Sequence, residues 1–176
     1  MKKLIIAIFF LSLGINAQDI KGGFKISPNF STFSKDIDNS SKGNIGYGIG
    51  YFETCEINSN LALQGEINYT NVSYETNKGT TKIQYSFIEI PLILKYKLDN
   101  LNIGFGVQYG FGMTGQTKTQ EQTTASEPEN DKGILLDVSL DRDKYIFGLR
   151  YYNGAEKIYN GNSIGNISFT IGYIIF

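Results

Sequence analysis

The sequence predicts an all-β fold built from eight antiparallel strands that run up and down in chain order. Three observations support this prediction. Apolar residues recur at every second position over most of the chain, which is the period of a strand rather than of a helix. Connections between these segments alternate between long and short. Glycine, serine, threonine, asparagine and glutamine dominate the face opposite the apolar one.

The clearest strand runs from Ile88 to Leu98, where each even position is large and apolar and most odd positions are polar. Asp99 and Asn100 follow as a two-residue hairpin turn, because both residue types tolerate the positive φ that such turns need. The alternation then continues from Leu101 to Met113 on the same face. These two strands therefore define each other's register.

The other segments follow the same pattern along the chain. Gly115–Lys132 contains almost no apolar residue and is predicted to be a mobile loop. Short turns are expected at 58–60, 99–100 and 142–143, and long loops at 31–42, 71–81, 115–132 and 153–163. The expected strands span residues 20–30, 45–57, 61–70, 83–98, 101–113, 134–141, 145–152 and 166–175.

Two positions interrupt the alternation. Apolar residues are odd-numbered at Ile83, Tyr85 and Phe87 but even-numbered from Ile88 onward, which predicts a β-bulge near Phe87–Ile88. At the other end, Ile175 belongs to the apolar face, so Phe176 is expected to lie out of phase with it.

Composition excludes several classes of function. The 176 residues carry a net charge of −1, include no histidine and contain a single cysteine. A Ser-His-Asp site and a Cys/His metal site are therefore impossible, and no basic field indicates nucleic acid. We expect no cofactor. Residues 1–17 have the basic start, apolar stretch and small final residue of a secretory signal peptide, which leaves residues 18–176 as the barrel domain.

Each strand is long enough to cross a bilayer at a tilt, whereas no stretch approaches the ~20 apolar residues of a spanning helix. The uniformly apolar face, the tyrosines near strand ends and the scarcity of lysine and glutamate on the other face favour an eight-stranded antiparallel up-and-down transmembrane β-barrel. Its short turns would be periplasmic and its long loops extracellular. Because lipid offers backbone groups no partners, the first and last strands must pair. A soluble lipocalin-like barrel with an apolar interior is the alternative.

The charged side chains on the polar face are expected to lie inside the barrel. Eight strands leave just enough room for side chains to fill the lumen, so these charges are expected to pair and close it. A selective pore or proton path is the alternative, and catalysis by paired carboxylates is disfavoured because opposite charges are interleaved. The expected lumen network comprises Lys25, Glu66, Glu89, Lys95 and Arg150.

Several segments resemble a known family. Phe87–Tyr96, FIEIPLILKY, resembles the signature YLEIPLLLKY of the PorT-like (porin-family) outer-membrane β-barrel domains of Bacteroidetes. Matches also occur at Gly23–Asn29, Leu63–Tyr69, Gly148–Gly154 and Ile171–Phe176. The resemblance implies an outer-membrane barrel with Glu66, Glu89, Lys95 and Arg150 as recurrent inward charges.

The sequence therefore predicts a non-enzymatic integral protein of the outer membrane, with a structural or surface-interaction role. A small-solute channel is the alternative function. The expected partners are outer-membrane lipid, the barrel-assembly machinery through the C-terminal strand, and an extracellular ligand at the loops. The protein is expected to be a monomer, reaching the membrane through the periplasm.

Overall fold

A computed structural model describes residues 20–33, 42–76, 80–120, 122–126, 128–156 and 163–176. The segment expected to be a signal peptide lies outside the described residues. No helix in the described part of the chain has the length and apolarity to cross a membrane. The strands are β1 (Ile20–Phe33), β2 (Lys42–Asn58), β3 (Leu61–Thr76), β4 (Thr81–Leu98), β5 (Leu101–Lys118), β6 (Thr123–Ser126), β7 (Asp131–Arg142), β8 (Tyr145–Gly154) and β9 (Ile164–Ile174).

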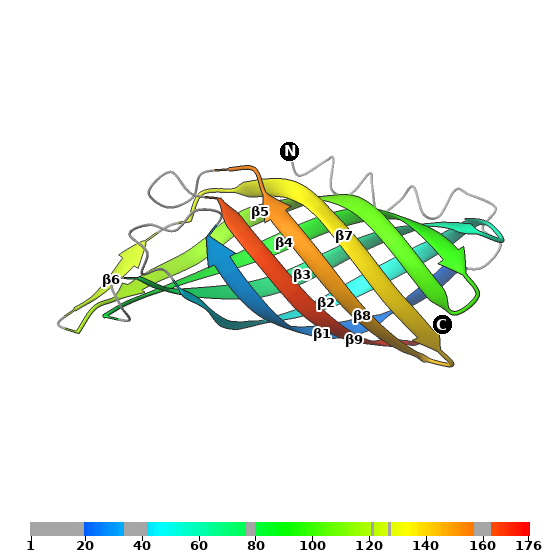
Figure 1. Ribbon diagram of the computed structural model, residues 1–176, viewed down its shortest axis with the longest axis horizontal. Coiled ribbons are helices and arrows are strands. Elements are labelled where there is room, and N and C mark those ends of the chain that lie inside the picture. The colour runs from blue at the N-terminus through cyan, green and yellow to red at the C-terminus, as the bar shows by residue number, and fades with distance from the viewer. Residues whose placement is uncertain (1–19, 34–41, 77–79, 121, 127, 157–162) are drawn as a thin grey trace.

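Eight of these strands close into an antiparallel barrel (Figure 1). The ladder runs in the order β4-β3-β2-β1-β9-β8-β7-β5 and closes through β4–β5, while the short strand β6 pairs with β5. The predicted pairing of first and last strands is therefore confirmed as β1–β9. Closure leaves no free edge in the barrel wall, as a structure surrounded by lipid requires.

The apolar face of every barrel strand points outward. Phe24, Leu92 and Phe105 have exposed fractions of 61%, 48% and 55%, and Ile171 is also exposed. On the opposite face, Lys25 is only 7% exposed although it is charged. The apolar surface therefore covers the outside of the barrel, and the charged side chains are enclosed.

A β-bulge occurs at the predicted level, between Ser86 and Phe87 in the β4–β5 ladder, but its extra residue is not on β4. The β3–β4 register is continuous, and Ile83, Tyr85 and Phe87 are buried inside the barrel rather than on its outer face. The irregularity lies on the neighbouring strand, because Ser86 pairs with Thr114 whereas Phe87 pairs with Gly112, so Met113 is the extra residue. The switch from odd-numbered to even-numbered apolar residues therefore reflects a change in the side chains that line the lumen, from apolar to polar. The odd-numbered side chains of β4 point inward on both sides of the switch.

Several strands extend farther than the sequence predicted. The expected loop 71–81 is mostly strand, since β3 continues to Thr76 and β4 begins at Thr81. The expected mobile loop after Gly115 begins as a hairpin in which β6 pairs with the end of β5. The turn expected at 142–143 is shifted by one residue, and Asp143 takes the positive φ of 55° as Asp99 does in its turn, with 54°.

The extended strands form a sheet that projects from one end of the barrel, opposite the tight turns (Figure 1). We call β3 from Asn71, β4 up to Ser86, β5 from Thr114, and β6 the projecting sheet. At its base the Ser86 hydroxyl bonds with the Tyr69 hydroxyl at 3.0 Å and accepts a hydrogen bond from Asn71 Nδ2 at 3.1 Å. Beyond these residues the outward side is polar. β3 and β4 each contribute six residues to this sheet, 71–76 and 81–86, so the sheet extends roughly 15–20 Å past this boundary.

The last two residues form a β-bulge. Phe176 therefore lies on the outer face, and not out of phase with that face as the sequence predicted. The N–H groups of Ile175 and Phe176 both donate to the Gly22 carbonyl, at 2.8 and 3.4 Å, and the Gly22 N–H donates to the Phe176 carbonyl at 3.0 Å. Two residues thus oppose one, and both side chains lie on the outer face. A Cβ on Gly22 would stand 2.5 Å from the Phe176 ring, so glycine allows this packing.

Candidate functional site: the interior of the barrel

The centre of the lumen is occupied by the carboxylate of Glu66. Strand alternation on β3 directs this side chain inward, where it is fully buried. Lys25 Nζ lies 2.6 Å from Glu66 Oε2, and the Arg150 guanidinium reaches both oxygens, with Nη1 2.7 Å from Oε2 and Nη2 2.8 Å from Oε1. One carboxylate therefore joins β1, β3 and β8 across the interior.

Arg150 also connects this carboxylate to a second one. Its Nε donates to Asp137 Oδ1 at 2.9 Å, and its Nη2 lies 2.8 Å from the same atom. Lys95 Nζ lies 3.6 Å from Asp137 Oδ2 and donates to the Ser139 hydroxyl at 3.3 Å. We call Lys25, Glu66, Lys95, Asp137 and Arg150 the lumen network.

Polar side chains complete the hydrogen bonding around Glu66. Gln64 Nε2 donates to Oε1, Asn68 Nδ2 donates to Oε2 at 2.9 Å, and Thr54 Oγ1 donates to Gln64 Oε1 at 3.0 Å. Gly50 makes room for this layer, because a Cβ there would stand 1.9 Å from Asn68 Oδ1. These hydrogen bonds and the ion pairs with Lys25 and Arg150 offset the large desolvation cost of burying the Glu66 carboxylate.

Four of the five residues predicted for the network are linked by contacts in the structure, either directly or through Asp137. The fifth, Glu89, is not. Glu89 lies inside the barrel, but its Oε2 accepts a hydrogen bond from the Thr70 hydroxyl at 2.7 Å, and it forms no ion pair with any described residue. Glu89 lines the same small cavity as Lys25 and Arg150 but makes no direct ion pair with either of them. Glu89 is the ladder partner of Asn68, which is the next inward-facing residue after Glu66 on β3.

Asp137 was not among the residues predicted for the network. The register of one hairpin would have identified it, because Asp137 and Arg150 are directly paired across β7 and β8. A tight turn at 143–144 implies this pairing, whereas the predicted turn at 142–143 does not. An error of one residue in a turn was enough to hide the contact.

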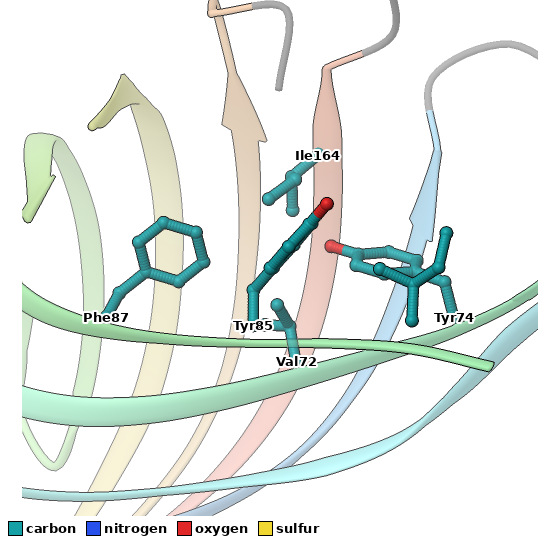
Figure 2. Close-up of a cluster of buried hydrophobic side chains, with 6 residues drawn as sticks. Val72, Tyr74, Tyr85, Phe87 and Ile164 are labelled. Carbon is teal, nitrogen blue, oxygen red and sulfur yellow. The ribbon is translucent and has the colours of Figure 1, made fainter. Parts of the chain in front are cut away.

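A cluster of apolar side chains lies in the lumen at the end that carries the projecting sheet, mostly on the inward side of that sheet. Figure 2 shows side chains from β3 and β4 extending into the enclosed space toward Ile164 on β9. Tyr74 and Ile83 are 0% exposed. This outer apolar cluster consists of Val72, Tyr74, Ile83, Tyr85, Phe87 and Ile164.

Further contacts occur at other levels of the lumen. Ile93, Leu135 and Tyr152 pack together, and the Tyr152 hydroxyl donates to Asp131 Oδ2 at 2.8 Å. At the end with the tight turns, Glu56 Oε1 lies 3.0 Å from Lys21 Nζ and 2.6 Å from Lys97 Nζ. The lumen thus contains both charged and apolar clusters.

The cavities that remain between these layers are small. Three of them have volumes of about 30, 20 and 20 Å³, enough for one or two water molecules each. The largest is lined by Lys25, Asn68, Glu89 and Arg150 among others. No group of three or more Cys, Asp or Glu side chains suited to a metal ion occurs among the residues the structure describes. Each of these three cavities has room for water.

Comparison with known proteins gives a consistent result. A family model described as "Outer membrane protein beta-barrel domain" matches residues 4–174. No curated protein sequence matches the chain.

Two crystal structures share the fold. Ail, the attachment invasion locus protein of Yersinia pestis, in complex with the heparin analogue sucrose octasulfate, is 13% identical with a TM-score of 0.57, over 90% of this chain and 100% of Ail. Neisserial surface protein A, NspA, is 13% identical with a TM-score of 0.56, over 90% of this chain and 98% of NspA.

Proposed function

Because this chain belongs to the outer membrane protein beta-barrel domain family, we propose that it is a non-enzymatic outer-membrane protein that contacts partners at the cell surface. The protein lies in the outer membrane with its apolar face against lipid. In this proposal the lumen is closed by its own side chains, and the activity resides in the projecting sheet. The finer assignment to PorT-like proteins rests on the FIEIPLILKY segment.

The projecting sheet is the observation that carries the proposal. It is continuous with the barrel wall and therefore held rigidly, and its outward side offers hydrogen-bonding and charged groups. Lys82 is paired with Glu75 on one side and with Lys118 on the other, so charges form a row across three strands. Rigid polar surfaces limit the entropy lost on binding. Ail is described as an attachment protein and NspA as a surface protein, which supports a similar role here.

The interior supports a structural role rather than catalysis. Both carboxylates of the lumen network are engaged by Arg150 and by a lysine, so neither is available as a general acid or base. The chain contains no histidine that could take that role.

Trimming the projecting sheet tests the proposed surface role. We expect cells that display a variant with residues 117–124 replaced by Asn-Gly to lose most adhesion to surfaces coated with extracellular-matrix protein or sulfated glycan, on which wild-type cells are retained. Attached cells would be counted after washing. Heat-dependent gel mobility would verify that the trimmed barrel still folds. Equal adhesion by both proteins would contradict the proposal.

A small-solute channel is the second candidate function. The polar cavity lined by Glu89 and Arg150 is the observation that favours it. We expect the purified protein to give no steady current in planar bilayers, because the cavities in the lumen hold only one or two waters. A steady, ion-selective current that Lys95→Ala abolishes would establish a channel instead. The matched control is Lys118→Ala, which alters an exposed lysine on the projecting sheet.

Further parts of the proposal concern export and assembly. We propose that residues 1–17 act as a signal peptide and that the protein is a monomer. The barrel-assembly machinery would recognise the C-terminal strand, where the bulge at Gly22 supports presentation of Phe176 on the outer face.

A further inference from the structure

Glu53 on β2 is a carboxylate on the membrane-facing side of the barrel. It shares that side with Tyr51 and Cys55, and across the ladder it is paired with Gly22 and Gly65. A charge on the lipid-facing side of a barrel is most costly at the bilayer centre and less so near the interfaces, and a charge within a membrane-spanning segment is a candidate binding site. The other charged residues on this side, among those described, lie at strand ends: Lys42, Glu75, Lys82, Lys118, Lys132 and Arg142.

The carboxylate is held in a defined position. The Tyr51 hydroxyl donates a hydrogen bond to Glu53 Oε1 at 2.6 Å. Glu53 forms no ion pair within the described part of the chain, and Oε2 has no hydrogen-bond partner there. One oxygen therefore remains available for a donor that approaches from the membrane.

A shallow depression lies directly beside this carboxylate. At Gly65, the cross-strand partner of Glu53, a Cβ would meet no atom within 4 Å, so the outer surface is bare backbone at that point. Leu63 and Ile67 flank it along β3, and Leu92 lies across it on β4. Their exposed fractions are 38%, 40% and 48%. The depression thus has three apolar sides and one acidic side.

Its position matches the periplasmic surface of the membrane. Glu53 is two ladder steps from Ile175, which lies at the barrel end that carries the tight turns. Aromatic pairs surround this level: Phe24 packs edge-to-face on Tyr51 with ring centroids 5.5 Å apart, and Tyr145 does so on Tyr173 at 5.4 Å. Aromatic belts of this kind mark the depth of lipid headgroups.

We propose that Glu53 and the depression at Gly65 bind a phospholipid that has a primary ammonium headgroup, of the phosphatidylethanolamine class, in the periplasmic leaflet. Glu53 Oε2 accepts a hydrogen bond from the ammonium group, and an acyl chain lies over Gly65 between Leu63 and Ile67. An amphiphile satisfies both the acidic and the apolar sides. A lysine of a neighbouring membrane protein would satisfy only the acidic side.

Native mass spectrometry of the detergent-purified protein tests this site. Phosphatidylethanolamine and phosphatidylcholine with identical acyl chains would be titrated separately, because the second headgroup has no N–H to donate. We expect wild type to bind phosphatidylethanolamine about tenfold more tightly, the effect of one charge-assisted hydrogen bond. We expect Glu53→Gln to remove this preference and Glu75→Gln, a glutamate on the projecting sheet, to retain it.

A second variant separates the two parts of the site. Gly65→Leu fills the depression and is expected to weaken retention of both phospholipids, while Glu53→Gln affects only the ethanolamine lipid. Glu53→Gln removes a charge from the lipid-facing surface, so it is expected to fold at least as well as wild type. The proposal is overturned if wild type does not discriminate between the lipids, or if Glu75→Gln abolishes the preference. It is also overturned if a photo-crosslinker at position 65 captures a protein instead of lipid in outer membranes.

Discussion

Replacing Glu66 with glutamine is expected to reduce the free energy of unfolding by about 3–5 kcal/mol, because it leaves Lys25 and Arg150 buried without their shared counter-charge. Glutamine preserves the volume of the side chain and part of its hydrogen bonding, so the loss measures the missing charge. Urea-induced unfolding in detergent would give this free energy. Because the chain contains no tryptophan, the transition would be followed by circular dichroism and by heat-dependent gel mobility.

Glu89→Gln is the matched control. It alters a second carboxylate inside the same lumen, but the side chain there bonds to the Thr70 hydroxyl and forms no ion pair with a described residue. We expect a loss of less than about 1.5 kcal/mol, the scale of one neutral hydrogen bond. Equal losses for the two variants would show that Glu89 shares in the charge pairing, as the sequence alone had suggested.

Replacing Phe87 with alanine is expected to reduce the free energy of unfolding by about 3–5 kcal/mol, because it creates a cavity in the outer apolar cluster. Phe87 is 2% exposed and contacts Tyr85 edge-to-face, with ring centroids 6.4 Å apart. The same unfolding experiment would measure the loss. Met113→Ala, beside Phe87's ladder partner Gly112 and 54% exposed, is expected to cost less than about 1 kcal/mol.

The Phe87 result also decides between two phases of β4. If Phe87 faced lipid, as the alternation of the sequence suggested, its removal would leave no internal cavity and would resemble Met113→Ala. A large loss therefore requires the inward orientation. It would also show that an apolar layer contributes to the interior of the barrel alongside the lumen network.

The two predictions together describe how the barrel tolerates charges in its interior. Charges at the centre are neutralised by partners on other strands, while apolar layers lie toward the projecting sheet. The three cavities described among these groups are small.

Local pattern was sufficient for most of the architecture. The period of two at Ile88–Leu98 and Leu101–Met113 correctly separated the outward residues from the inward ones, because adjacent side chains on a strand must point to opposite faces. Asp99 was correctly placed at positive φ. Lys25, Glu66, Lys95 and Arg150 were predicted to face the lumen because a charge facing away from lipid must point there, and in the structure contacts link them, Lys95 through Asp137.

Pattern failed where the environment changed along one strand. Ile83, Tyr85 and Phe87 continue the inward face of β4, yet they are apolar because the lumen itself is apolar at that level. Alternation identifies two faces but not which of them touches lipid. Polar residues such as Asn71 and Thr81 were likewise assigned to a loop, although above the membrane a strand has no need of an apolar face.

By itself, the sequence determined most of the strands, their antiparallel order and the division of each strand into an apolar and a polar side, because each of these depends on residues near one another in the chain. Only the tertiary structure decided that Glu66 meets Lys25 and Arg150, that Glu89 stands apart, and that Phe176 returns to the outer face. These outcomes depend on the stagger with which the barrel closes. That stagger sets the height at which side chains from distant strands meet, and a pattern read along one strand does not contain it.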